Sequence, residues 1–500
     1  MRIFSLSAKL RRNLWYILAL MLSTRLISLA VLPITDVTEA RYGEIARKML
    51  ETGNWVTPQY DYGIPFWGKP PLSTWLSAAS MKVFGITAFA ARLPELILGL
   101  GVLWMVWFLA KKRHNRDFSL LSVSILSSLL LFFFANGAVM TDASLAFSIC
   151  ISFIAFWMVT VETGNRRRIL WGYVFFVGQG LGLLAKGPIC GVLTLFPIFL
   201  WTWIRGNRWR LLWNSLPWVK GTMLMLFIAA PWYIWAEHRT PGFIDYFIVG
   251  EHFRRFMTPG WQGDKYGHAH EAMVGTIWVY WLAGVLPWSL IAVTWAARRF
   301  RSLKALFEDQ DGWAMYLLCW TVWPMLFFTM AHNILWTYPL PCLPAFALLV
   351  AEIWHRSLQR QFPEEGLPHR HRYWALFSMP ALVALLTSLL MFSPPVQIQK
   401  ITQKYLCQKY VKLRPSADSQ LYYVFCRYYS AEFYLGRQAH HTDDLAEVRK
   451  LLTNNSRDFL AVQDAGKIPA DILKHFSMVA RSGKVILFEE NSFKSFWRPN

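Results

Sequence analysis

Long apolar runs recur along this chain and limit the folds it can adopt more than any other feature. A helix needs roughly 20 apolar residues to cross a bilayer, and about eleven stretches meet that length. They lie near residues 13–33, 94–110, 118–135, 143–161, 169–185, 188–204, 217–235, 275–297, 312–330, 338–354 and 374–392. With 55% hydrophobic residues and 27 tryptophans, a 500-residue soluble enzyme is excluded. The sequence therefore predicts an all-α polytopic membrane protein with about 11–13 membrane-spanning helices.

The basic residues stand in short clusters between these apolar runs. If the first cluster, "KLRR", is cytoplasmic, then "KKRHNR", "ETGNRRR", "IRGNRWR", "RRFRSLK" and "HRSLQR…HRHR" fall on the same side, as the positive-inside rule requires. The formal charge of +21 is thus explained by topology, and nucleic acid is not expected as a partner. No small-residue cleavage site follows the first run, so no cleavable signal peptide is expected.

The same topology leaves three longer segments on the outer face of the membrane. They are residues 34–93, residues 236–274, and everything after about 393. The tail alternates β-rich runs such as "LYYVF" and "KVILFEE" with helical ones such as "DDLAEVRKLL". We therefore expect a membrane domain over 1–392 and a small α/β domain over 393–500 outside the membrane, with the chemistry on the outer face.

Cysteine usage gives no sign of a metal centre. Four of the six cysteines lie in expected spans and are interpreted as packing residues: Cys150, Cys190, Cys319 and Cys342. The other two, Cys407 and Cys426, lie in the tail, where an oxidising compartment would allow them to pair. The chain has no metal-type cysteine spacing, no Walker loop and no dinucleotide-binding glycine pattern.

The first outer segment predicts an amphipathic helix from Thr38 to Leu50, with apolar and charged residues on separate faces. Such a helix is expected to lie on the membrane surface. Asp36 and Glu39 stand at its start and fit two interpretations. They can form a capping-box-like N-terminus, or they can converge with Arg41 where a lipid headgroup would lie.

Seven stretches in one order resemble a known family. They are "TEARYGEIARKMLETGNWVTP", "GKPPLSTWL", "FGITAFAARLP", "LLAKGP", "GVLPWS", "TYPLPCLPAFALL" and "YYSAEFYLGR". In this order they are similar to bacterial polyprenyl-phosphate-sugar glycosyltransferases of the GT-C fold, which include the lipid A aminoarabinose transferases and relatives of the protein O-mannosyltransferases. The resemblance implies a multispan enzyme that moves a sugar from a lipid phosphate to an acceptor on the outer face.

The resemblance assigns several residues to the site. Glu39, Arg41 and Tyr42 match the family's Asp-Glu-x-Arg-Tyr segment, and Lys69 with Pro70 matches its Glu-Lys-Pro. Asp142 matches the aspartate that follows the third span, and Tyr338 is similar to the tyrosine before a late proline-rich span.

The departures from the family pattern concern the same site. Thr38 replaces the aspartate usually proposed as catalytic in the aminoarabinose transferases, and Gly68 replaces their glutamate. The lysine region before their late tyrosine reads His332, Asn333 and Trp336 here. The broad superfamily is supported more strongly than identity with the aminoarabinose enzyme.

A lipid-phosphate donor gains negative charge on its leaving group as the glycosidic bond breaks, and a fixed cation favours that transition state. Lys69, between Gly68 and prolines, is the expected cation, and Arg41 is the expected second phosphate ligand; the alternative for Lys69 is snorkelling to the interface. A carboxylate is expected to activate the acceptor as general base. Asp36, Glu39 and Asp142 are the candidates, and Asp36 or Glu39 is our first choice. No metal is required, although a divalent ion is compatible.

Other candidates stand at the ends of expected spans and in the second outer segment. Asp142 is expected to orient a cationic partner, or simply to cap the fourth span. Lys186 in "AKGP" is expected either to touch phosphate or to snorkel. In the second outer segment, we expect His252, Arg254 and Arg255 to meet anionic groups of the acceptor.

Two further histidines of that segment, His268 and His270, have a spacing that only weakly suggests a metal site and fits solvated loop residues better.

The expected function is thus an inverting transfer of a sugar from a polyprenyl (undecaprenyl) phosphate to an envelope acceptor. Lipid A or another lipopolysaccharide component is the first candidate acceptor, and a protein hydroxyl is the second. A transporter of lipid-linked sugars is the alternative class, but the chain shows no internal repeat of the kind such folds carry. A monomer is expected.

Overall fold

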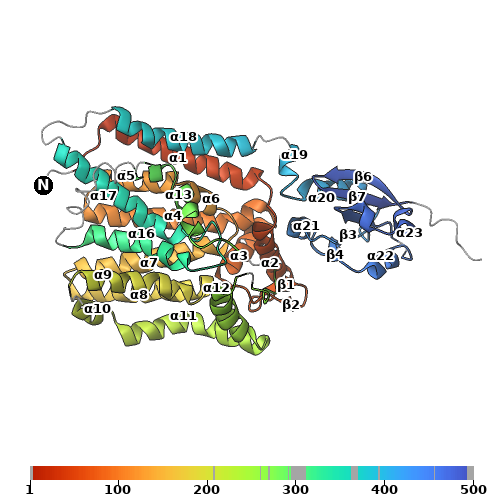
Figure 1. Ribbon diagram of the computed structural model, residues 1–500, viewed down its shortest axis with the longest axis horizontal. Helices are drawn as coiled ribbons and strands as arrows, with labels where there is room; N and C mark the ends of the chain where they lie inside the picture. The colour runs from red at the N-terminus through yellow and green to blue at the C-terminus, as the bar shows by residue number, and fades with distance from the viewer. Residues whose placement is uncertain are drawn as a thin grey trace, which may run out of the picture.

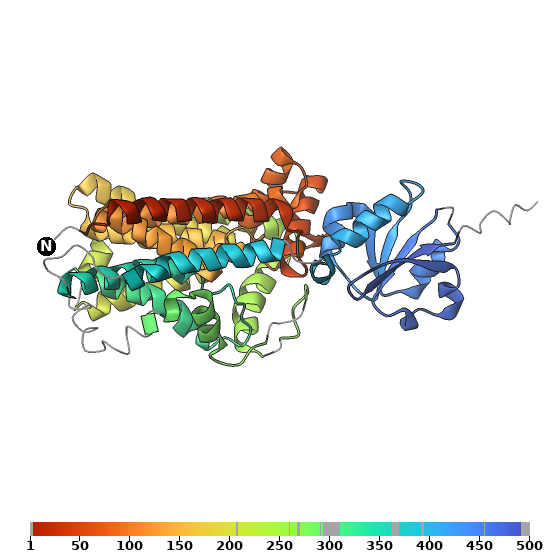
Figure 2. The same ribbon diagram turned by 90° about the horizontal axis from the view of Figure 1, so that it is seen from above.

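The computed structural model describes residues 4–206, 209–259, 261–267, 271–290, 292–293, 311–361, 370–391, 395–454 and 456–491. Most of the chain forms a long helical bundle, and a smaller domain of strands and helices lies at one end of this bundle (Figures 1 and 2). The N-terminus lies at the opposite end of the bundle (Figure 1). This arrangement confirms the expected all-helical membrane part with a C-terminal α/β domain.

Each of the eleven predicted spans contains at least one helix, although residues 291 and 294–297 of the span near 275–297 lie outside the described residues. The helices are α1 (Ala8–Val31), α4 (Ala88–Arg113), α5 (Arg116–Ser128) with α6 (Leu130–Ala135), α7 (Thr141–Val161), α8 (Asn165–Lys186), α9 (Ile189–Ile204), α11 (Trp218–Arg239), α13 (Thr276–Gly284), α16 (Trp313–Thr329), α17 (Leu343–Gln361) and α18 (Arg370–Met391). Among the described residues, α1, α4, α7, α8 and α11 are each long and apolar enough to cross a membrane unaided. The third predicted span is broken at Leu129.

The bundle core is rich in aromatic side chains. Phe153 of α7 stacks on Trp320 of α16 with ring centroids 4.2 Å apart, and the Tyr316 hydroxyl donates to the Phe153 carbonyl. Trp201, Trp313 and Trp320 are almost completely buried. Since aromatic rings bury large areas and pack edge-on or offset, these contacts hold α7, α9 and α16 together beneath the site described below.

At the end of the bundle near the C-terminal domain, the first outer segment folds into α2 (Thr38–Thr52), the hairpin of β1 (Gln59–Asp61) and β2 (Ile64–Pro65), and α3 (Leu72–Phe84). The second outer segment forms the π-helix η1 (Asp245–Arg254) and α12 (Arg255–Met257). The helix expected over Thr38–Leu50 is confirmed.

The prediction that α2 lies on the membrane surface is wrong, however, because the charged side of this helix is covered by protein. Glu44, Arg47 and Lys48 are each no more than 5% exposed.

The C-terminal domain contains one five-stranded sheet in the order β4-β3-β5-β7-β6. β3 (Leu421–Val424) pairs in parallel with β4 (Ala439–Thr442) and β5 (Phe459–Val462), whereas β7 (Val485–Glu490) runs antiparallel to β5 and to β6 (Phe476–Ser482). The helices are α20 (Lys404–Leu413), α21 (Tyr429–Leu435), α22 (Leu445–Leu451) and α23 (Ala470–Leu473), with α19 (Pro395–Ile398) leading in.

The disulfide that Cys407 and Cys426 could form in an oxidising compartment is not present in the structure. Both thiols are free and buried, and both belong to the apolar cluster that packs α20 and α21 on the sheet. They act as small apolar core residues.

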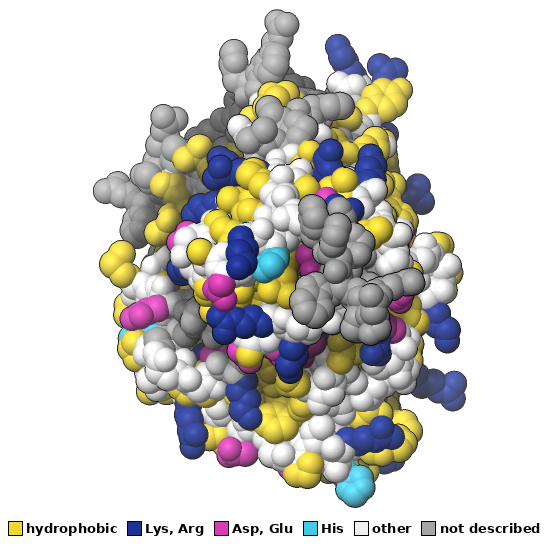
Figure 3. Space-filling view, turned by 90° about the vertical axis from the view of Figure 1, so that its right-hand side faces the viewer, with side chains coloured by type: hydrophobic (Ala, Val, Ile, Leu, Met, Phe, Trp, Pro, Cys, Tyr) yellow, Lys and Arg dark blue, Asp and Glu magenta, His cyan; other side chains and the backbone are white. Residues whose placement is uncertain are grey.

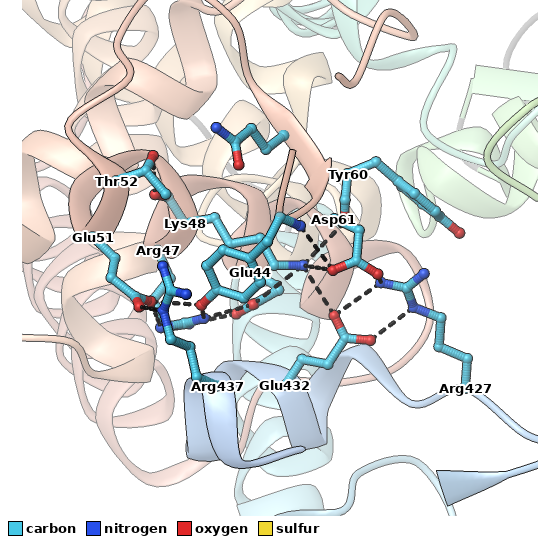
Figure 4. A network of polar contacts seen from close by, with 12 residues as sticks. Glu44, Arg47, Lys48, Glu51, Thr52, Tyr60, Asp61, Arg427, Glu432 and Arg437 are labelled. Atoms are coloured by element: carbon cyan, nitrogen blue, oxygen red, sulfur yellow. Dashed lines mark hydrogen bonds and ion pairs between the residues drawn. The ribbon is translucent and has the colours of Figure 1, made fainter. Parts of the chain in front are cut away.

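α21 docks on α2 through a group of charged side chains that we call the interdomain cluster (Figure 4). Its members are Glu44, Arg47, Lys48, Glu51, Asp61, Arg427, Glu432 and Arg437. At its centre, the Lys48 ammonium lies 3.1 Å from Glu432 Oε2 and donates to the Tyr60 carbonyl at 3.0 Å. Arg427 binds both Glu432 and Asp61. The cluster therefore joins α2, the β1–β2 hairpin and the C-terminal domain.

Seen from the end that carries the C-terminal domain, lysine and arginine side chains are scattered among apolar and uncharged ones (Figure 3). They form no continuous basic surface on the face drawn. A broad basic surface of that kind is what nucleic-acid binding requires, so this face gives no reason to revise the expectation from the sequence.

Candidate active site

A cavity of about 140 Å³ opens where the two outer segments meet the ends of the bundle helices. Its polar lining comes from α2, from the residues before α3, from the start of α7, the end of α8, η1 and α12, and from the segment between α16 and α17. The charged and hydrogen-bonding residues there are Thr38, Arg41, Tyr42, Lys69, Thr141, Asp142, Lys186, Glu251, His252, Arg255, Asp264, Tyr266, Asn333 and Tyr338. The structure thus gathers the predicted substrate-binding residues around one space, with the exception of Arg254.

Asp142 and Lys186 form an ion pair on one wall of the cavity. Asp142 stands in the first turn of α7 and Lys186 is the last residue of α8. Because α7 and α8 are consecutive antiparallel helices, these positions meet, and Lys186 Nζ lies 2.6 Å from Asp142 Oδ1. The same ammonium lies 4.3 Å from the centroid of the Tyr338 ring. Lys186 therefore points into the cavity instead of snorkelling, and Asp142 is next to a cation.

On the opposite wall, Glu251 bridges Lys69 and Arg255. Lys69 Nζ lies 2.7 Å from Glu251 Oε2, and Arg255 Nη1 lies 3.1 Å from both oxygens of the same carboxylate. Asp264 Oδ2 lies 3.4 Å from Arg255. Burial alone would raise the pKa of Glu251, but the Lys69 and Arg255 charges outweigh it and lower that pKa to about 2. Glu251 is therefore ionised throughout the physiological pH range.

Arg41 has spare hydrogen-bonding capacity. Its Nη1 donates to the Tyr266 carbonyl at 2.5 Å, and its guanidinium lies 5.6 Å from the Tyr42 ring centroid. Its Nε is buried and finds no hydrogen-bond partner within the described residues. A buried guanidinium N–H without an acceptor is costly, so an anion entering the cavity would satisfy it.

The structure places Glu39 outside the cavity, where it joins three structural elements. Its carboxylate takes two 2.7 Å bonds from Arg92 of α4, and it accepts from the backbone N–H of Thr35 and, at 3.4 Å, of Val139. Burial would raise the pKa of Glu39, but the Arg92 charge and the Thr35 hydrogen bonds lower it below its ordinary value. These contacts tie the start of α2 to α4 and to the segment that leads into Asp142.

Asp36 also lies outside the cavity lining, against the C-terminal domain. Its Oδ1 accepts from the Ser430 backbone N–H at 2.9 Å, and its Oδ2 accepts from the Ser430 hydroxyl. Burial raises the pKa of Asp36 to about 6 despite these hydrogen bonds. The capping-box interpretation is wrong, because α2 begins after Val37 without a side-chain cap. The placement of neither carboxylate supports a role as general base.

The second outer segment contributes fewer of its predicted contacts. His252 lines the cavity, and its two ring nitrogens lie 2.8 Å from the Phe247 carbonyl and 3.1 Å from the Lys186 carbonyl. Burial lowers the pKa of His252, so the neutral ring donates to only one of them. Arg254 is exposed and does not line the cavity. His268 and His270 lie outside the described residues, within which no cluster of three or more His, Cys, Asp or Glu could hold a metal.

Glu251, Asp264 and Tyr266 are among the cavity residues that sequence reasoning missed. Glu251 stands four residues before Arg255 in a helical segment, and that spacing is a signal for an ion pair. Asp264 and Tyr266 come from an irregular stretch, where no periodicity indicates which side chains turn inward. Asn333, noted only as a departure from the family, also lines the cavity, and its Oδ1 is buried without a hydrogen-bond partner among the described residues.

A membrane-embedded helical bundle with a cation-rich cavity at one end defines a class of integral membrane proteins that handle lipid-linked anions. Residues 14–247 match the family model described as dolichyl-phosphate-mannose-protein mannosyltransferase. The fold resembles the crystal structure of ArnT from Cupriavidus metallidurans bound to undecaprenyl phosphate, with a TM-score of 0.73 and 18% identity, covering 97% of this chain and 99% of that one.

Curated relatives agree with this class. The undecaprenyl phosphate-alpha-4-amino-4-deoxy-L-arabinose arabinosyl transferase of Erwinia tasmaniensis is 29% identical over 331 residues, which are 65% of this chain and 56% of that protein. Its counterpart from Aeromonas salmonicida is 31% identical over 324 residues, which are 64% and 56%. The chain is thus similar to polyprenyl-phosphate-sugar glycosyltransferases of the GT-C fold. The match spans a little over half the length of these two relatives.

Proposed function

We propose that this protein transfers a sugar from an undecaprenyl-phosphate carrier to lipid A or another lipopolysaccharide component at the periplasmic face of the inner membrane. The observation that carries the proposal is the set of four basic side chains, Arg41, Lys69, Lys186 and Arg255, around one cavity at the end of the bundle. Three carboxylates line the same cavity. The four basic side chains outnumber the three carboxylates by one, so an anion that enters the cavity compensates the remaining positive charge.

The chemistry follows from the charge on the leaving group. A sugar linked to a lipid phosphate carries one negative charge on the phosphate, and the released lipid phosphate approaches two. Lys69 and Arg255 on one wall and Arg41 beside them can donate hydrogen bonds to these oxygens, and a fixed cation in a cavity of low dielectric stabilises the growing charge most. The proposal assigns charge neutralisation to these residues and includes no metal or other cofactor.

Asp142 is the carboxylate best placed to act as general base. Both oxygens of Glu251 are occupied by cations, and Asp264 accepts from the Tyr266 N–H and pairs with Arg255. Within the described chain only one oxygen of Asp142 is engaged, by Lys186. Its other oxygen can take a proton from the acceptor hydroxyl while the sugar inverts. Thr38, where the family has an acid, lines the same cavity with a hydroxyl only.

A protein hydroxyl is the second candidate acceptor, favoured by the match of residues 14–247 to a family described as protein mannosyltransferases. The donor site and the proposed base would be the same for both acceptors. Mass spectrometry of envelope lipids from a strain lacking this protein separates them, because loss of a sugar from lipid A supports the first and an unchanged lipid profile supports the second.

The direct test uses purified protein in lipid nanodiscs with an undecaprenyl-phosphate sugar and a lipid A acceptor. We expect the donor to be consumed and the sugar to appear on the acceptor. Movement of intact donor across a sealed vesicle without cleavage would instead identify a transporter. Cysteine labels at positions 60 and 450 should react from the periplasmic side, and reaction from the cytoplasmic side would reverse the proposed orientation.

A further inference from the structure

Glu251 is the most heavily engaged carboxylate in the cavity. Its side chain is only 3% exposed. Its two oxygens accept from Lys69 at 2.7 Å, from Arg255 at 3.1 Å twice, and from the Tyr246 hydroxyl at 3.3 Å. Lys69 and Arg255 both also face the cavity. The carboxylate therefore lies between two cations that an incoming phosphate would use.

A carboxylate and a phosphate compete for the same donors. Both present anionic oxygens, and both suit the fork of an arginine and the point charge of a lysine. The residue before Lys69 is Gly68, which carries no side chain, where the family that this chain resembles has glutamate. The anionic partner of Lys69 is instead supplied by Glu251 of the second outer segment, which lies in a helix far from Lys69 in sequence.

We propose that Glu251 is a resident competitor for the lipid phosphate: in the free protein it holds Lys69 and Arg255, donor binding displaces it from Lys69, and its return helps to expel the lipid-phosphate product. This inference rests on the proposed function. Tyr246 and Arg255 remain as partners for the displaced carboxylate, so it need not lose all its contacts when the phosphate enters.

The competition matters most after the transfer step. The product carries more negative charge than the donor, so the same cations hold it more tightly and its release becomes slow. A carboxylate that returns to Lys69 lowers the affinity for the product without weakening the cations during the reaction. Removing the carboxylate charge is therefore expected to tighten binding and to slow turnover at the release step.

The first test is direct binding of undecaprenyl phosphate to the full-length protein in nanodiscs, with no acceptor present. Glu251→Gln is expected to bind it about tenfold more tightly than the wild type, the order of a charge-assisted interaction. Glu271→Gln is the matched control, because Glu271 is exposed on the same segment and does not line the cavity. It should bind as the wild type does.

Equal or weaker binding by Glu251→Gln overturns the inference while leaving the proposed function intact. A wild type that fails to bind undecaprenyl phosphate at all overturns the proposed function, and the inference with it. Thermal unfolding of each variant shows whether it is folded. If Glu251→Gln does not fold, Glu251→Asp is the deciding variant, because it keeps the carboxylate charge but shortens the side chain that reaches Lys69. We expect that variant to bind about two- to fivefold more tightly, and unchanged binding overturns the inference.

The second test compares a single turnover with steady-state turnover. In Glu251→Gln, the single-turnover rate should stay within about threefold of the wild type, whereas the steady-state rate falls about tenfold and added undecaprenyl phosphate inhibits more strongly. A residue that merely supports the fold would lower both rates together. Equal slowing of both rates therefore overturns the role in product release.

Discussion

The interdomain cluster and the cavity both contain charged residues of the first outer segment, yet they differ in the ratio of acidic to basic side chains and in accessibility. The interdomain cluster holds four acidic and four basic side chains, and its central residue, Lys48, is 1% exposed. Among the described residues, the cavity lining has four Lys or Arg and three Asp or Glu side chains, and Arg41 Nε finds no hydrogen-bond partner. A balanced, closed cluster fixes parts of the protein relative to one another, whereas an unbalanced, open one is ready to receive an anion.

α2 contributes to both clusters through different turns. Its first turns carry Thr38, Arg41 and Tyr42 to the cavity, and its later turns carry Glu44, Arg47, Lys48 and Glu51 to the interdomain cluster. The β1–β2 hairpin is likewise held by Asp61 and leads directly toward Lys69. The interdomain cluster therefore fixes the positions of α2 and the β1–β2 hairpin, and through them the positions of Arg41 and Lys69.

The largest effect should come from the cavity. Lys69→Ala is expected to abolish transfer, a loss of about 10³-fold or more, because the growing charge on the leaving group loses its nearest cation. The thermal unfolding temperature should stay close to that of the wild type. Lys82→Ala, an exposed lysine of α3 in the same outer segment, is the control. Wild-type turnover by Lys69→Ala would remove Lys69 from the mechanism.

The interdomain cluster should respond in the opposite way. Lys48→Met removes a buried cation that Glu432 and Glu44 share, although each keeps an arginine partner, and we expect a loss of about 1–3 kcal/mol of stability. We expect a lower unfolding temperature with near-normal specific activity in the protein that stays folded. Arg449→Gln breaks an exposed pair with Asp471 and should change little. Lost activity at unchanged stability in Lys48→Met would contradict the distinction between the clusters.

Asp142 and Glu39 offer a closer comparison, since each is a buried carboxylate paired with one cation. Asp142→Asn should lower the rate about 10²-fold by removing the base, with a smaller loss of stability than Glu39→Gln. Among the described residues, Lys186 is the one hydrogen-bond partner of the Asp142 carboxylate, whereas Glu39 joins Arg92 to Thr35 and Val139. Glu39→Gln should chiefly lower the unfolding temperature, because it breaks the buried pair with Arg92. Rate measurements and thermal unfolding on both variants check this. The reverse pattern would restore Glu39 as the base.

The smallest effect concerns pH and Asp36. The pKa of Asp36 is raised in the folded protein to about 6, from 3.8, so the folded state binds more protons than the unfolded state between these values. Stability from this group is therefore present at low pH and is lost as pH rises toward 6. We expect Asp36→Asn to stabilise the protein by about 1 kcal/mol at pH 7 and by less at pH 5. Unfolding temperatures compared across this range test it, and a gain that grows toward low pH would contradict the sign.

The sequence predicted the parts of this molecule that depend on local pattern. Eleven apolar runs became helices because a bilayer demands long, uninterrupted apolar segments. The cavity cations were found because short motifs around Arg41, Lys69 and Lys186 resemble a family.

The roles of Asp36 and Glu39 could not be deduced, because their partners are distant in sequence. Arg92 lies 53 residues from Glu39, and Ser430 lies 394 residues from Asp36. The amphipathic pattern of α2 showed that one face is polar, and it could not show that a distant domain would cover it.

The docking of α21 on α2 also sets an order for biosynthesis. Lys48 and its partner Glu432 are 384 residues apart. At roughly 5–20 residues per second, Glu432 is made on the order of 20–80 s after Lys48. Until then, Glu44 and Asp61 are the carboxylates of the described residues that can pair with Lys48. Every described residue that lines the cavity, from Thr38 to Tyr338, is therefore made before the interdomain cluster can be completed.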